Sequence, residues 1–205
     1  MAPCIKIPSG FLPEIGPAIV PSYDPIMSQI AVELLKLQAD VAFQEFLGAI
    51  EGVEELQAWG VMPQTGQGDL NTDGSIHGIV LHVATGKVMY ASSAFKGTEI
   101  RWRDVADEIE SFEPSWTSAQ EYLKAAQKYW MESWAHLADE DLLRDVQRPQ
   151  GNWKPAWEIV YTVLGHDAYH AGQVALLRCA GQASSTPPPS VAEDLRKHCP
   201  GLPTW

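Results

Sequence analysis

The sequence has no long hydrophobic run and few basic residues, and each scarcity excludes a class of partner. No segment approaches the roughly 18 apolar residues that a helix needs to cross a bilayer, so we expect no membrane partner. The chain carries 14 lysines and arginines against 26 acidic residues, a formal net charge of −12. Because this field repels phosphate backbones and the basic residues form no cluster, we expect no nucleic acid partner either.

Cysteine is scarce as well. Cys4, Cys179 and Cys199 are odd in number, widely separated and without a CxxC pair. This pattern excludes a disulfide framework and a thiolate metal site. Cys179 falls in an apolar helical stretch, where we expect a small buried side chain. Proline and glycine interrupt the apolar stretches near the N-terminus, which makes a poor secretory signal, so we expect a cytoplasmic protein.

The order of apolar residues predicts one all-α domain between two irregular ends. Prolines recur throughout residues 1–27 and prevent regular helix there, so this segment is interpreted as a proline-rich arm. The domain covers residues 28–181, and a tail with a short helix at 190–198 covers residues 182–205. The first helix is predicted to end by Gly60. Its apolar residues recur at helical spacing: Ile30, Leu34, Leu37, Val41, Phe46 and Ile50.

Three further helices complete a four-helix bundle. The second follows Asp73 or Ser75 as its cap, and the third covers residues 117–137, where Thr117 and Gln120 resemble a capping box. The fourth begins at Pro155 and ends at Gly181. Strand evidence is thin. The long second connection, residues 95–116 with a short helix at 102–111, can cross one end of the bundle, which allows the second and third helices to run parallel.

The histidines carry the functional signal. His166 and His170 are four residues apart, so on a helix their rings project from one face. Two imidazole nitrogens at this spacing can reach a single ion. Of the other histidines, His82 is the best placed third ligand because it lies on the apolar face of the second helix. We therefore predict a divalent metal site at His82, His166 and His170, with the catalytic residues unknown.

Each remaining histidine has a simpler interpretation. His77 is about 140° round the helix from His82 and is expected to be exposed. His136 is expected at the surface or in packing, and His198 in solvent. A fourth protein ligand, from His136 or Gln173, would close the site and make the ion structural, and this alternative stays open.

The sequence resembles the DinB/YfiT-like family of metalloenzymes. The resemblance rests on the second histidine of GSIHGIVLHVA, His82, and on the segment HDAYHAGQ of the last long helix. The resemblance covers residues 28–181 in helix order, long second connection and histidine positions. It implies a bound divalent ion, with zinc or nickel favoured, held by His82, His166 and His170. It also implies a small-molecule substrate, in some relatives a low-molecular-weight thiol such as bacillithiol or mycothiol, and a possible homodimer. Relatives often carry an acidic residue soon after the second-helix histidine, and VATGKVMY here has none.

Three classes of function remain open. The first, by analogy with the family, is metal-dependent thiol S-transferase activity on a small electrophile. The second is a metal-dependent hydrolase of small molecules; HDAYH differs from the protease signature HExxH by having Asp167 in place of glutamate. The third is a non-catalytic protein that binds a metal or a ligand. An open coordination position would favour catalysis, and a closed one a structural ion.

Aromatic residues are abundant, and we expect most of them to pack. Trp130 and Trp134 are four residues apart, as are Trp153 and Trp157, which is typical of a core or a dimer interface. Tyr90, Tyr161 and Tyr169 are likewise interpreted as helix-surface packing, with support of the metal ligands as the alternative.

Overall fold

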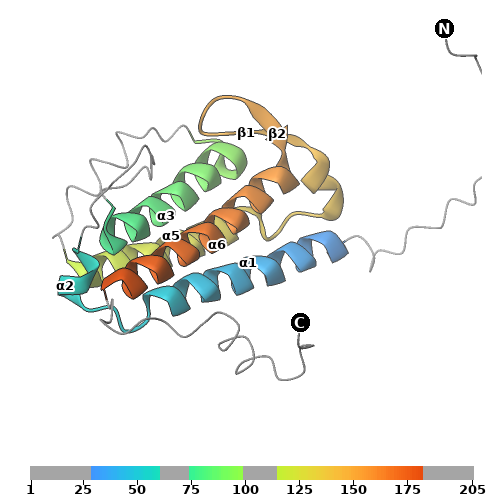
Figure 1. The fold of residues 1–205 in the computed structure, drawn as a ribbon. Helices are drawn as coiled ribbons and strands as arrows, with labels where there is room; N and C mark the ends of the chain where they lie inside the picture. Colours follow the sequence, from blue (N-terminus) through green and yellow to red (C-terminus); the bar gives the residue numbers. More distant parts are fainter. Residues whose placement is uncertain (1–28, 61–73, 99–114, 182–205) are drawn as a thin grey trace, which may run out of the picture.

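Four long helices make up most of the described part of the chain (Figure 1). The computed structural model describes residues 29–60, 74–98 and 115–181. The long helices are α1 (Ile30–Ile50), α3 (Ile76–Tyr90), α5 (Trp116–Trp134) and α6 (Ala156–Gly181), and α2 (Glu55–Ala58) is a single turn. The predicted all-α bundle is confirmed. The proline-rich arm, the helix at 102–111 and the tail helix at 190–198 lie outside the described residues.

The second and third long helices run parallel. At one end of the bundle, Trp116 Nε1 at the start of α5 donates to the Val53 carbonyl oxygen, 2.7 Å away, just after α1. At the other end, the hydroxyls of Ser92 and Tyr129 lie 3.3 Å apart, which joins the segment after α3 to the end of α5. The order is therefore up, down, down, up, as the long second connection predicts (Figure 1).

The core lies between these helices in two apolar clusters. Near the α2 end, Phe46, Val83 and Leu123 are fully buried, and near the opposite end Trp130 and Trp134 are fully buried. The prediction that this tryptophan pair packs in the core is confirmed. α1 packs against α6, and α3 packs against both α5 and α6.

The first helix turns only part of its predicted apolar row to the core. Its buried residues are Val32, Ala39, Phe43, Phe46 and Ile50. Of the six apolar residues whose spacing predicted this helix, four are exposed: Ile30, Leu34, Leu37 and Val41. The helix carries two apolar stripes, and the small side chain of Ala39 lets α6 approach the inner one. It also ends at Ile50 rather than near Gly60, because Gly52 adopts φ +70° and turns the chain.

Of two predicted helix caps, the structure confirms one and contradicts the other. Ser75 caps α3, with its Oγ accepting from Gly78 N at 2.9 Å, as one of the two predicted alternatives. The cap of α5 is Ser115, whose Oγ accepts from Ser118 N at 3.0 Å, so the capping box at Thr117 is wrong. Glu55 of α2 also accepts from Trp116 N, which satisfies a second free amide at this helix start.

Two irregular features were not predicted. α3 continues into a π-helical segment, η2 (Ala91–Lys96), which Gly97 ends with φ +64°. Before α6, β1 (Asp145–Gln147) and β2 (Trp153–Pro155) pair as an antiparallel hairpin. Each strand is only three residues long, too short for an alternating pattern to be recognised in the sequence. Pro155, predicted as the start of the fourth helix, is the last residue of β2, and α6 begins one residue later at Ala156.

Surface positions complete the comparison. Cys179 is exposed, so its predicted burial is wrong. Trp153 and Trp157 are also exposed. None of the described helices is both long and apolar enough to span a membrane.

The N-terminus of α1 is capped from a distant segment, and this contact is testable. The Asp139 carboxylate accepts from the Ala31 and Val32 amides, at 3.0 and 2.9 Å. Asp139→Ala should lower the free energy of unfolding by about 1 kcal/mol, because two helix-start amides lose their acceptor. Urea denaturation measures the change, with Glu140→Ala on the exposed neighbour as the control. Equal stability of the two variants would contradict the role of the cap.

Candidate metal centre

Three histidine rings meet at the seam between α3 and α6. His166 and His170 lie one turn apart on α6, and His82 faces them from α3. The Nε2 atom of His166 is 2.9 Å from that of His82 and 3.1 Å from that of His170. Within the described part of the chain, these three residues are the only group of His, Cys, Asp or Glu side chains close enough to share an ion. The structure thus brings together the predicted residues.

The nitrogen spacing fits one metal ion. Two ligands at about 2.1 Å from an ion lie about 3.0–3.4 Å apart at octahedral or tetrahedral angles. The observed separations are close to this range. Hydrogen bonds between the rings explain these short distances less well. His166 Nε2 faces the Nε2 atoms of both His82 and His170, and a single proton on it cannot form two full hydrogen bonds. The donor set can therefore hold a single divalent ion.

His170 is oriented by a chain of polar contacts behind it. Gln173 Nε2 donates to the Tyr169 hydroxyl at 3.0 Å, so its Oε1 faces His170 Nδ1 at 2.6 Å. Because an amide oxygen only accepts, the proton sits on Nδ1 and the lone pair of Nε2 points toward the other two rings. Gln173 thus supports His170 rather than closing the site as a fourth ligand. Tyr169, interpreted from the sequence as surface packing, belongs to this support.

Burial keeps the rings neutral. Desolvation, helped by the charges of His170, His82 and Lys87, lowers the pKa of His166 to about 3. Desolvation and His82 lower the pKa of His170 to about 4, and desolvation also lowers the pKa of His82. Neutral imidazole is the form that binds metals. At neutral pH the three rings are therefore ready to coordinate without releasing a proton.

A glycine gives His166 its space. A Cβ atom built on Gly86 of α3 would lie 3.6 Å from His166 Cε1, which is ordinary contact. Alanine therefore fits, whereas a larger side chain would push His166 away from the other two rings. His82 has the least support, because its buried Nδ1 has no hydrogen-bond partner within the described ranges.

The other histidines lie elsewhere. His77 is buried and stacks on Trp59 with ring centroids 3.9 Å apart, so its predicted exposure is wrong. The packing of α2 against α3 produces this contact, which helix periodicity alone cannot show. His136 is exposed, as predicted, and does not belong to the histidine group. His198 lies outside the described residues.

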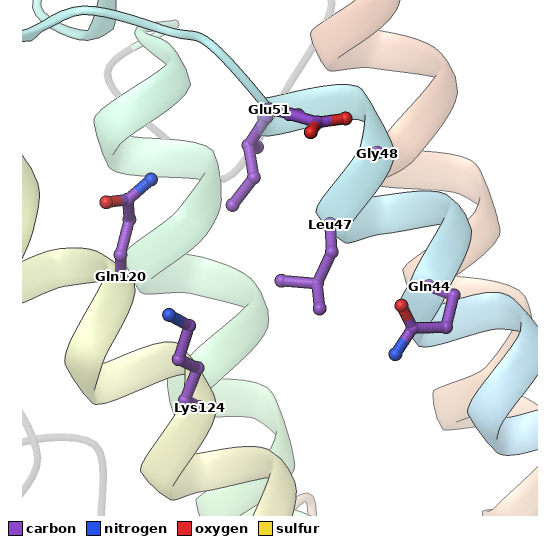
Figure 2. A pocket seen from close by; sticks show the side chains of 7 residues that line it. Gln44, Leu47, Gly48, Glu51, Gln120 and Lys124 are labelled. Atoms are coloured by element: carbon purple, nitrogen blue, oxygen red, sulfur yellow. The ribbon is translucent and has the colours of Figure 1, made fainter.

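A separate hollow opens at the other seam of the bundle, between α1 and α5 (Figure 2). Its volume is about 490 Å³. Leu47 and Glu51 of α1 lie on one side, and Gln120 and Lys124 of α5 on the other (Figure 2). None of the three histidines lines this space. The hollow is therefore distinct from the candidate metal centre.

Comparison with protein families agrees with this arrangement. The family model of the DinB superfamily matches residues 38–174. The chain belongs to the DinB superfamily. The matched range contains His82, His166 and His170, together with all of α3 and α5. No curated protein matches the chain.

Next to the histidines, this DinB-superfamily protein buries an ion pair. Lys87 Nζ of α3 lies 2.5 Å from Asp167 Oδ2 of α6, and both side chains are almost fully buried. Burial lowers the pKa of Lys87 and raises that of Asp167, and the attraction between them opposes both shifts. Lys87 also lies over the Phe43 ring, 5.4 Å from its centroid. Asp167 is thus neutralised inside the core, which argues against the role of the glutamate in HExxH proteases.

Removing one member of this pair should be far more harmful than removing both. Lys87→Met should lower the free energy of unfolding by about 3–5 kcal/mol, because Asp167 stays buried without its partner. Lys87→Met/Asp167→Leu should recover most of this loss. Urea denaturation of chelator-treated protein measures both. Lys128→Met, in an exposed pair with Glu132 at 3.9 Å, is the control and should cost at most about 1 kcal/mol.

Stability should depend on pH through the triad. Below the ordinary histidine pKa of about 6.5 the unfolded chain protonates these side chains. In the folded protein, burial lowers the pKa of His166 to about 3 and that of His170 to about 4, so both rings stay neutral to much lower pH. The unfolded state then binds more protons, so the free energy of unfolding falls as pH decreases from 7 to 5. Each such histidine contributes a slope of up to about 1.4 kcal/mol per pH unit. In metal-free protein, His166→Ala should flatten the slope and His136→Ala should not; equal slopes would contradict the shifted pKa.

Proposed function

We propose that this DinB-superfamily protein binds one divalent metal ion, zinc or nickel, through His82, His166 and His170, and transfers a low-molecular-weight thiol to a small electrophile. One observation carries the proposal: three neutral imidazoles converge with no carboxylate among them. Three protein ligands are the number found in catalytic zinc sites, which keep a further position for water or substrate. We place the reaction in the cytoplasm, where thiols stay reduced.

The charge of the site favours a thiol as the substrate. Neutral ligands leave both positive charges of the ion uncompensated, and the nearest buried carboxylate, Asp167, is already paired with Lys87. Such a centre favours an anionic ligand from the substrate. A bound divalent ion would supply Lewis acidity, which lowers the pKa of a coordinated thiol or water. The sulfur then forms a bond to the electrophilic carbon, the leaving group departs with its electron pair, and the thiol proton passes to solvent.

Neighbouring residues hold the metal-binding histidines in position. Gln173 holds His170 in one tautomer, and Gly86 leaves room for His166 at its side. His82 and His166 are only partly buried, while His170 is buried, so substrate approaches from the side of the first two. Tyr169 lies edge-on to His170, with ring centroids 5.1 Å apart, and is largely exposed.

Metal content tests the first half of the proposal. Elemental analysis of untagged protein should give close to one divalent ion per chain, and His166→Ala should lose most of it, because two rings bind far more weakly than three. His136→Ala, on an exposed histidine, should keep the wild-type content. Wild-type protein that takes up no zinc or nickel would remove the metal site.

Turnover tests the second half. Metal-loaded protein is incubated with a panel of low-molecular-weight thiols and small electrophiles, and the loss of free thiol is followed. We expect transfer by the wild type that chelation abolishes and that His82→Ala lacks. Metal binding without transfer above the His82→Ala rate would reject the transferase and retain the metal-binding protein.

A further inference from the structure

Arg148 lies in the turn between β1 and β2, and no described carboxylate forms an ion pair with it. The hairpin fixes its backbone, since Arg148 N donates to the Asn152 carbonyl oxygen and Gly151 N donates to the Arg148 carbonyl oxygen, both at 2.8 Å. The side chain is half-buried. Its Nη2 donates to the Tyr90 hydroxyl at 3.2 Å, whereas its buried Nε has no partner among the described residues. The turn therefore holds a cation in a defined place with donors to spare.

The cations next to Arg148 in the hairpin are paired. Arg144 forms an ion pair with Asp141 at 3.0 Å, and Lys154 of β2 forms one with Glu158 at 2.8 Å. A guanidinium offers five N–H donors and can bind a carboxylate through two of them, and burying it without an anionic partner costs free energy. Acidic residues outnumber basic ones by 26 to 14, yet none in the described ranges pairs with Arg148. Its state points to an anion from outside the chain.

Arg148 lies beyond the metal centre along the seam of α3 and α6. His82, Gly86 and Tyr90 follow one another at intervals of four on α3, and all three are half-buried. Since an α-helix rises about 1.5 Å per residue, Tyr90 lies about 12 Å from His82 along the axis. β1 packs against η2 and β2 leads into α6, so the hairpin lies at the end of this seam (Figure 1). Arg148 is therefore roughly two helical turns from the three histidines.

The stretch between the two positions is open at Gly86. A Cβ atom built on this glycine would have only atoms of His166 within 4 Å among the described residues. No side chain of the α3 row stands between His82 and Tyr90. A ligand can therefore extend over Gly86 and contact the metal centre and Arg148 together.

We propose that Arg148 binds a carboxylate of the thiol substrate while the sulfur binds the ion. The inference rests on the proposed function and makes Arg148 the residue that determines which thiols are used. The ion and the guanidinium are two positive charges that match a thiolate and a carboxylate. This local match counts because the net charge of −12 otherwise repels anions.

The separation of the two charges selects the size of the thiol. Of about 12 Å along the helix, a metal–sulfur bond takes about 2.3 Å and a hydrogen bond to the carboxylate about 2.8 Å. About 7 Å then remains between sulfur and carboxylate, the length of about two residues of extended chain. Free cysteine, in which only two carbon atoms separate the sulfur from the carboxylate, is too short. The substrate class is therefore a thiol of two- or three-residue size with a terminal carboxylate.

Cobalt-loaded full-length protein gives a readout that needs no turnover, because a thiolate bound to cobalt(II) absorbs in the near ultraviolet. Titration with glutathione, a tripeptide thiol, and with its diethyl ester gives a dissociation constant for each. Arg148→Met should raise the constant for glutathione by about 10-fold or more and leave that for the ester unchanged, because the ester offers no carboxylate. Arg148→Lys should lose less, since an ammonium keeps the charge without the planar fork.

Arg144→Met, on the paired arginine of the same hairpin, is the matched control and should keep the wild-type constants. Circular dichroism checks that all variants keep their helix content. Equal binding of glutathione by the wild type and Arg148→Met would overturn the inference. So would an equal loss of glutathione and ester, because that result means a structural effect. A wild type that takes up cobalt but shows no thiolate absorption with either ligand would overturn the proposed function, and this inference with it.

Discussion

The close approach of α3 to α6 is the constraint on which the centre depends. His82 comes from one helix and His166 with His170 from the other, so a shift of one turn, about 5.4 Å, would separate the three nitrogens. One residue after His166, the buried pair of Asp167 with Lys87 crosses the same seam. A buried ion pair adds little net stability, but it penalises every register that separates its charges. Gly86 supplies the remaining space.

The polar layer weakens the core where it lies. Three neutral rings, an ammonium and a carboxylate stand at positions that apolar side chains fill elsewhere in the bundle. His82 Nδ1 and Asp167 Oδ1 are buried without partners within the described ranges, and such atoms are costly. The apolar clusters on either side, around Val83 and around Trp130, offset this cost. A bound ion would recover part of it, because it binds only the folded state.

α1 has two apolar faces, and only one of them packs in the core of the described structure. Its inner stripe, with Phe43 and Phe46, closes the bundle, whereas the side chains of its outer row are exposed. A sequence pattern identifies apolar positions but not the direction in which each points. Ile30, Leu34, Leu37 and Val41 form a regular row, and this spacing predicts the helix without showing which face is buried. The structure turns this row outward because Val32 and Ala39 fit closely against α6.

The spacing of residues along the chain determined much of the fold. The spacing of His166 and His170, the apolar periods of four helices and the long second connection were sufficient to predict the bundle, the parallel α3 and α5, and the three histidines, because these features depend on neighbours in the chain. Tertiary packing alone decided the rest. The stacking of His77 on Trp59 and the pairing of Lys87 with Asp167 depend on which helix lies opposite. The same is true of the exposure of Ile30, Leu34, Leu37 and Val41. No local period contains that information.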